Sequence, residues 1–281
     1  MKKILLPTDF SDYSWNAIEY ALNLFKDEPC TFHLLNTYTP IIYNIEYTEL
    51  NAAQLDFIDS RKETSKKGLE ELQKRIEKEF KNSNHTFTQI SSFNILINEI
   101  KELVKDQAIE LIVMGTKGAT GAKEILLGTN TIHVIKNAKC SVLAIPSDFS
   151  FETPHEILFP SDYNIDFQLK HVKTLIEIAK LYHSRVHILN VSFGYDLTKD
   201  QEQNKQKLKK HFKNIAHIFH SVNNQSVEEA ITKFQLKARV NLLVMMNNKH
   251  SFFENLFFKS TISQIGFHLN IPFLVIPSKT T

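Results

Sequence analysis

The stretch that decides the fold is residues 111–129, which read LIVMGTKGATGAKEILLGT. Its first four residues form a short apolar run, which is typical of a buried strand. Spaced glycines follow, among them Gly115, Gly118 and Gly128, and an amphipathic segment begins at Thr129. A strand, a glycine-rich loop and a helix in this order predict an anion-binding turn in an α/β fold.

The same stretch recurs later in the chain without its glycines. Residues 242–260 read LLVMMNNKHSFFENLFFKS, and the two copies align without a gap as far as Pro146 and Pro277. Other segments repeat in the same order: KKILLPTDF at 2–10 with HEILFPSDY at 155–163, TFHLLNT at 31–37 with RVHILNV at 185–191, and Phe-Lys-Asn at 80–82 and 212–214. Repetition in one order indicates a duplicated domain.

Apolar runs rich in Ile, Leu and Val alternate with amphipathic segments within each copy. Nearly continuous apolar runs indicate strands that are buried on both faces of a parallel sheet. We therefore predict two tandem doubly wound α/β domains, each with a five-stranded, mostly parallel sheet flanked by helices. The expected domains are residues 1–148 and 154–281, and the short polar stretch between them is a linker. In the first copy we expect strands at 4–8, 31–37, 85–90, 110–115 and 141–146, and helices at about 11–25, 50–80 and 95–107 and after 128.

Composition argues against several classes of partner. The 281 residues carry 33 basic and 31 acidic side chains, a balance that does not favour nucleic acid or a membrane surface. No apolar run approaches the length of a membrane span, and the first run stops at Pro7, too early for a signal peptide. Cys30 and Cys140 are interpreted as buried thiols in a reducing compartment. We therefore expect a cytoplasmic protein.

The candidate site lies where predicted strands end, because open α/β sheets bind ligands beyond the carboxyl ends of their strands. Glycines without Cβ let backbone amides approach a ligand and can take a positive φ. The first amides of the helix after Gly128 have no intrahelical partner and attract an anion. The residues concerned are Pro7, Thr8 and Asp9 after the first strand, Thr37 after the second, Met114, Gly115 and Gly118 after the fourth, and Gly128, Thr129 and Asn130 at the helix.

Simpler interpretations of the same residues stay open at this point. The glycines could form a plain turn or mark a helix boundary, and Asp9 could cap the helix that follows it. The spacing is not that of a P-loop, because no Gly-Lys-[Ser/Thr] follows. A Ser/His/Asp arrangement and a metal-binding set of Cys, His and Asp are also not found in the sequence.

The chain resembles the universal stress protein family, in its ATP-binding branch. The resemblance rests on the opening ILLPTDFS, the segment LIVMGTKGATGAKEILLGTNT and the closing SVLAIP, and it covers the whole chain as a tandem pair of flavodoxin-like domains. It implies that Asp9 meets the nucleoside and that the backbone of Thr37 lies near adenine. It also implies that the ribose and phosphates are held by Gly115, Gly118, Gly128, Thr129 and Asn130.

Two further points follow from the resemblance. Lys117 stands where the family often has histidine, and this lysine could pair with a phosphate or be a solvated charge. The two domains are expected to pack as an internal pseudo-dimer through their last strands, Ser141–Pro146 and Pro272–Pro277. Association of two chains into a homodimer is left open, as are other protein partners.

The second copy is expected to lack a working site. Met246, Lys249 and Lys259 replace the three glycines, although Asp162 and Ser260 keep the acidic and hydroxyl positions. The hypothesis is thus a stress-response protein that binds one ATP per chain in its first domain, with Mg²⁺ allowed between the phosphates. It is a regulatory module and at most a slow ATPase. The alternatives are a weak ATP hydrolase or phosphotransfer enzyme, and a nucleotide-free interaction module.

Overall fold

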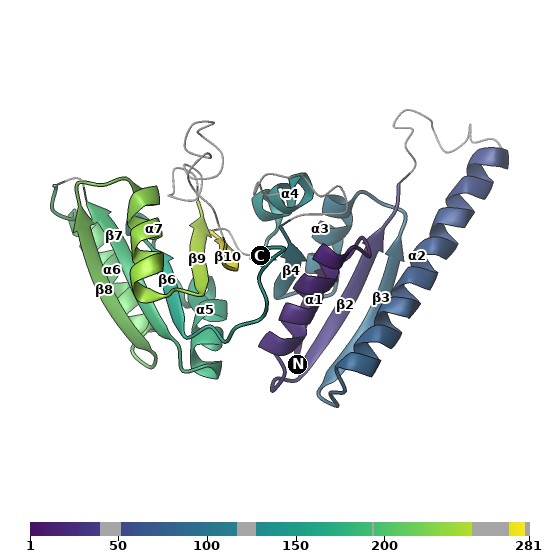
Figure 1. The fold of residues 1–281 in the computed structure, drawn as a ribbon. Helices are drawn as coiled ribbons and strands as arrows, with labels where there is room; N and C mark the ends of the chain where they lie inside the picture. The colour runs from purple at the N-terminus through teal and green to yellow at the C-terminus, as the bar shows by residue number, and fades with distance from the viewer. Residues whose placement is uncertain (40–51, 117–127, 193, 249–269, 279–281) are drawn as a thin grey trace. The chain divides into compact units, whose positions relative to one another are not determined.

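A computed structural model describes residues 1–39, 52–116, 128–192, 194–248 and 270–278 (Figure 1). By its internal contacts the chain divides into two compact units, Met1–Ala138 and Lys139–Thr281. The division falls before the fifth strand of the first repeat, whereas the sequence places the boundary after that strand. None of the helices in the described ranges is long and apolar enough to cross a membrane.

The first unit is a parallel sheet in the order β3-β2-β1-β4, covered by helices. Leu6 pairs with Leu34 on one side of β1, and Ile4 pairs with Leu111 on the other. The strand order therefore reverses between β1 and β4, which is the position where such sheets bind ligands. The elements are β1 (Lys2–Pro7), α1 (Asp12–Leu24), β2 (Cys30–Thr37), α2 (Ala52–Glu79), β3 (His85–Ser92), α3 (Leu96–Asp106), β4 (Leu111–Gly115) and α4 (Thr129–Asn137).

Local sequence explains where these helices begin and what they bury. Ser11 caps α1, since its side chain accepts a hydrogen bond from the backbone N–H of Ser14. In α3, Ile100, Leu103 and Val104 are buried at the spacing of an amphipathic helix. The strands β1 and β4 are buried along most or all of their length, as their continuous apolar runs predict.

The second unit is a sheet in the order β5-β10-β9-β6-β7-β8. All its pairings are parallel except that of β5 with β10, in which Leu143 lies opposite Leu274 in an antiparallel register. The expected pairing of these two last strands is thus confirmed. The elements are β5 (Ser141–Ile145), β6 (Glu156–Pro160), α5 (Leu169–Leu181), β7 (Arg185–Ser192), α6 (Lys199–His211), β8 (Ala216–Asn223), α7 (Val227–Ala238), β9 (Leu242–Asn247) and β10 (Phe273–Pro277).

The predicted α/β fold with mostly parallel strands is confirmed. In the described part of the chain each repeat supplies five strands, and those of the first repeat overlap the expected ranges.

Candidate functional site

A cavity of about 370 Å³ opens at the carboxyl ends of β1, β2 and β4 in the first unit. It lies at the reversal of strand order, and the N-terminus of α4 forms part of its wall. The structure brings nine of the predicted site residues together in this lining: Pro7, Thr8, Asp9, Thr37, Met114, Gly115, Gly128, Thr129 and Asn130. Lys117 and Gly118 lie outside the described residues.

Four residues of the lining were not among the predicted binding residues. Ser14, Asn36, Leu96 and Thr131 also border the cavity. Asn36 precedes Thr37 at the end of the same strand, so its position was a usable signal. The others reach the cavity from three different helices, and only the packing of those helices brings them there.

The loop from β1 to α1 is held by a set of short hydrogen bonds. The Oγ1 atom of Thr8 accepts from the backbone N–H of Phe10 at 3.0 Å and lies 2.9 Å from the hydroxyl of Ser14. The side-chain amide of Asn36 donates to the carbonyl oxygen of Thr8 at 2.8 Å. Phe10 takes a left-handed backbone conformation, with φ of 64°. These contacts fix the direction in which Thr8 and the next residue, Asp9, face the cavity.

Asp9 has its carboxylate oriented by the same loop. Its Oδ1 atom accepts from the backbone N–H of Ser11 at 3.1 Å and from the Ser11 hydroxyl at 2.5 Å. Because Ser11 is the N-cap of α1, the interpretation of Asp9 as that cap is wrong. Asp9 is the one charged side chain in the described lining of the cavity.

The N-terminus of α4 meets the cavity without a side-chain cap. Its N-cap residue is Gly128, whose N–H donates to the carbonyl oxygen of Thr116 at 2.6 Å. The hydroxyl of Thr131 donates to the carbonyl oxygen of Gly115 at 2.8 Å and ties the first turn of α4 to the end of β4. The first amides of α4 are therefore placed beside the cavity, with the positive end of the helix dipole.

The glycines serve this site in a way that differs from the expectation. Gly128 has φ of −56° and ψ of 147°, an extended conformation that any residue can adopt. Gly115 also has no positive φ. Conformational freedom therefore does not explain glycine at these two positions. What remains is the absent side chain, which leaves room next to the backbone.

A second cavity of about 390 Å³ adjoins the first. The two share Thr37, Leu96, Thr129 and Asn130, and the second continues between the start of α3 and the first turns of α4. Its further lining is Thr39, Asn94, Ile95, Ile97, His133 and Val134. Its lining combines apolar side chains, such as Ile97 and Val134, with polar ones, such as Asn94 and His133, as small-molecule sites commonly do.

The second unit repeats the loop hydrogen bonds of the first. Ser161 accepts from the N–H of Tyr163, and the amide of Asn190 donates to the carbonyl oxygen of Ser161 at 2.9 Å. Tyr163 is left-handed like its counterpart Phe10, with φ of 56°. The duplication is therefore visible in hydrogen bonds as well as in sequence letters.

The ends of the strands are occupied differently in the second unit. Met246, at the position of Gly115, is 6% exposed, so the second unit has a buried side chain where the first has none. From α6, Gln201 donates to the carbonyl oxygen of Asp162 and Asn204 to that of Tyr163. A cavity of about 340 Å³ in this unit is lined from α6 and the ends of β7 and β8. Lys249 and Lys259 lie outside the described residues.

Comparison with known proteins places this fold and site in a family. A family model described as the universal stress protein family matches residues 1–146, more than half of the chain. The chain belongs to the universal stress protein family. Two family members from Methanocaldococcus jannaschii are similar to it: one is 32% identical over 149 residues, 51% of this chain and 81% of the relative, and the other is 31% identical over 152 residues, 51% and 94%.

A solved structure of the family has the same fold over nearly the whole length. It is the crystal structure of a universal stress protein from Archaeoglobus fulgidus, with a TM-score of 0.68, 20% sequence identity, and coverage of 98% of this chain and 96% of that one. At this identity the likeness speaks for the fold alone.

Proposed function

We propose that the protein binds one molecule of ATP in its first repeat and acts in the cytoplasm as a regulatory nucleotide-binding module. The proposal rests on the cavity at the ends of β1, β2 and β4. Residues from these strands and from α1 and α3 line it together with the N-terminus of α4. Membership of the universal stress protein family supports a role in stress response.

The chemistry of the cavity suits a nucleotide that contains phosphates. The uncapped amides of α4, with the hydroxyl of Thr129 and the amide of Asn130, offer hydrogen-bond donors to phosphate oxygens. At the other end Asp9 presents a fixed carboxylate, which suits the hydroxyls of a ribose. The adjoining cavity offers the apolar side chains of Ile95, Leu96 and Ile97, against which a base could pack.

Mg²⁺ is compatible with this site, because the ion is usually bound by substrate phosphates together with one or two carboxylates. Among the described residues no cluster of three His, Cys, Asp or Glu side chains could hold a metal by itself. When ATP is bound, the ion would neutralise phosphate charge and would be held by the phosphates themselves, because Asp9, the one carboxylate of the described lining, is assigned to the ribose.

The second repeat is proposed to bind no nucleotide. Its methionine at position 246 is buried where the first repeat has glycine, and α6 is hydrogen-bonded to the loop that corresponds to the Asp9 loop. This makes one ATP per chain the expected stoichiometry, which calorimetry or native mass spectrometry of the full chain measures.

The decisive experiment is a calorimetric titration of the full chain with ATP, ADP, AMP and cyclic AMP. Gly115→Met and Gly128→Lys each copy the second repeat into the first, and each is expected to weaken ATP binding at least about tenfold, or about 1.4 kcal/mol. Both new side chains take up space in the cavity, methionine beside the end of β4 and lysine beside the first amides of α4. Asn137→Lys adds the same charge at the far end of α4 and should bind like the wild type. Unchanged affinity in both glycine variants would contradict the proposed site.

The two alternatives give different results. An ATP hydrolase would convert bound ATP to ADP in a single-turnover incubation, whereas a binding protein leaves it intact over hours. The described lining contains no base other than Asp9, and Ser11 occupies one oxygen of that carboxylate. A nucleotide-free interaction module would show no heat with any nucleotide and no adenine absorbance in an extract of the denatured protein.

A further inference from the structure

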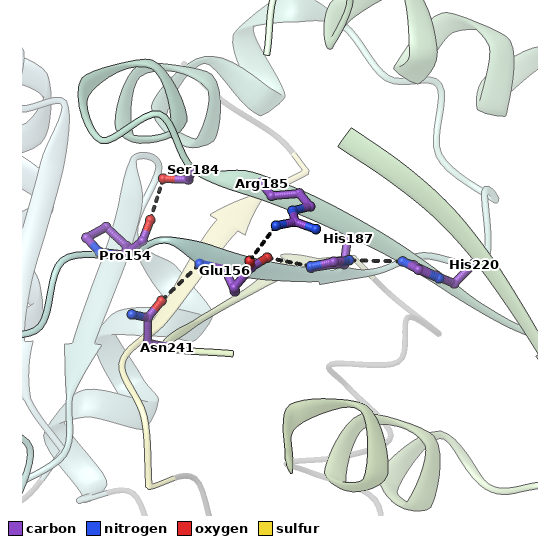
Figure 2. Close-up of polar contacts among 7 residues, drawn as sticks. All are labelled: Pro154, Glu156, Ser184, Arg185, His187, His220 and Asn241. Atoms are coloured by element: carbon purple, nitrogen blue, oxygen red, sulfur yellow. Dashed lines mark hydrogen bonds and ion pairs between the residues drawn. The ribbon is translucent and has the colours of Figure 1, made fainter. Parts of the chain in front are cut away.

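Three titratable side chains form a hydrogen-bonded row across β6, β7 and β8 of the second unit (Figure 2). The Nε2 atom of His187 lies 2.6 Å from Oε2 of Glu156, and its Nδ1 atom lies 2.9 Å from Nε2 of His220. His187 is 5% exposed. Both nitrogens of a buried imidazole are thus engaged, one with a carboxylate and one with a second imidazole.

The row is bounded by charged and aromatic groups. The other carboxylate oxygen of Glu156 pairs with the guanidinium of Arg185 at 3.1 Å, as Figure 2 shows. Phe234 of α7 packs over both imidazoles, with its ring centroid 5.2 Å from that of His187 and 4.7 Å from that of His220. The charged groups that act on the row are Glu156 from β6, Arg185 from β7 and Lys237 from α7.

Counting hydrogens shows how many protons the row can hold. Each of its two contacts needs one hydrogen between the two heavy atoms. With Glu156 ionised, two neutral imidazoles satisfy this if both carry their hydrogen on Nε2. One additional proton is also compatible, because the histidine pair then still has a donor facing an acceptor. A second additional proton places two N–H groups against each other at His187 Nδ1 and His220 Nε2, and the contact is lost.

The first repeat provides an internal comparison with the charge reversed. His33 occupies the position of His187, and Lys3 occupies that of Glu156. Leu35 lies opposite Ile90, whereas its counterpart Leu189 lies opposite His220. Among the described residues neither ring nitrogen of His33 has a hydrogen-bond partner. Equivalent buried histidines therefore have different neighbours in the two repeats. In the second repeat an anion and an imidazole lie beside His187, and in the first a cation and an isoleucine lie near His33.

We propose that Glu156, His187 and His220 form a proton-binding site that makes the second repeat sensitive to mild acid. The first proton is shared by the histidine pair and balanced by the carboxylate of Glu156. The second proton separates the two imidazoles, and β8 with the overlying Phe234 is then less firmly held to β7. The proposal is independent of nucleotide binding, since it concerns the other repeat.

The direction of the acid effect follows from burial. Burial lowers the pKa of His220, and the charges of His187 and Lys237 lower it further. An unfolded chain takes up this proton at about pH 6.5, and the folded chain only at lower pH. The unfolded state then binds more protons, so the contribution of this histidine to stability is lost as pH falls below about 6.5.

The test is an NMR pH titration of the full chain with ¹³C-labelled histidine, in which histidine-to-glutamine variants assign the signals. Because coupled sites titrate as a pair, the NMR signals of both rings of the row should change together in two steps, and the signal of His33 in a single step. Glu156→Gln removes the anion that balances the first proton and should move the first step to lower pH. Independent single steps for the two rings would overturn the proposal, as would an unchanged profile in Glu156→Gln.

A second readout is amide hydrogen exchange in β8 and α7. In the wild type, protection of these segments should fall through the second step. His220→Gln keeps a donor for His187 but takes up no proton, so it should remove that loss. His155→Gln, a change at an exposed histidine outside the row, is the matched control and should behave as the wild type. If His220→Gln loses protection in β8 and α7 at the same pH midpoint as the wild type, the proposal is contradicted. Should His220→Gln fail to fold, the wild-type ring titration still decides.

Discussion

The hydroxyl of Thr131 donates to the carbonyl oxygen of Gly115 at 2.8 Å, and Thr131 is 2% exposed. The bond joins the first turn of α4 to the last residue of β4, and both residues line the candidate cavity. It therefore sets the separation between the two parts of the wall that we propose to hold the phosphates.

Replacing Thr131 by valine keeps the shape of the side chain and removes the donor. The buried carbonyl of Gly115 then loses this partner, which typically costs about 1–3 kcal/mol. We expect the first unit of Thr131→Val to unfold at lower urea concentration and to bind ATP more weakly. Trp15, the single tryptophan of the chain, lies in α1 and reports unfolding of this unit by fluorescence. Thr131→Ser keeps the hydroxyl, so its urea midpoint should lie between those of the wild type and Thr131→Val. Equal midpoints in all three proteins would show that the bond contributes nothing to stability.

Gly68 of α2 lies against the ring of Phe10, the left-handed residue of the loop that carries Thr8 and Asp9. A methyl group on Gly68 would come within 2.5 Å of the Phe10 ring. Gly68→Ala is expected to destabilise the first unit by about 1–3 kcal/mol, as overpacking does. Because the ring is displaced, ATP affinity should fall as well.

A double-mutant cycle separates this contact from a general effect on α2. Phe10→Ala removes the ring, so the double variant with Gly68→Ala should be more stable than the sum of the single changes indicates. Urea denaturation followed by Trp15 gives the four free energies. Strict additivity would mean that the ring and the helix are not coupled.

The parts of the fold and of the candidate site that can be predicted from the sequence are those encoded by neighbouring residues. Apolar runs and glycine spacing are local, so the strands and the nine cavity residues followed from them. Thr131 and Ser14 could not be found in this way, because the packing of helices brings them to the cavity. The backbone conformation of a glycine is also not a local signal: the residue type permits a positive φ, but Gly128 sits at an extended N-cap.

The histidine row shows a second limit. Matching the Phe-Lys-Asn segments aligns residue 88 with residue 220. The strand register gives a different match. Ile90 lies opposite Leu35, and His220 lies opposite the equivalent residue Leu189, so residue 90 corresponds to residue 220. A shift of two residues keeps every side chain on the same face of the sheet, so the alternating pattern of the strand does not reveal it. The contact between His187 and His220 therefore needs the structure.

Both cysteines are expected to be unreactive in the native protein. Burial raises the pKa of Cys30 to about 11 and that of Cys140 to about 12. At pH 8 no more than about one thiol in a thousand would be ionised, and the thiolate is the reacting species. A thiol reagent that absorbs on reaction should therefore give a very slow signal with native protein, and two equivalents once urea unfolds it. Rapid modification of the native chain would contradict the buried positions.

His33 should make the first unit weaker in acid. It is 4% exposed, and burial lowers its pKa, which Lys3 lowers further. The unfolded chain takes up this proton at about pH 6.5 and the folded chain only at lower pH, so stability is lost as pH falls below that value. His33→Leu removes a buried ring without partners in the described structure and should raise stability, by more at pH 5.5 than at pH 8. Urea midpoints from Trp15 fluorescence at both pH values measure this, with His133→Gln, an exposed histidine of the same unit, as control. If His33→Leu and wild type lose stability equally between these pH values, the acid sensitivity of the first unit arises elsewhere.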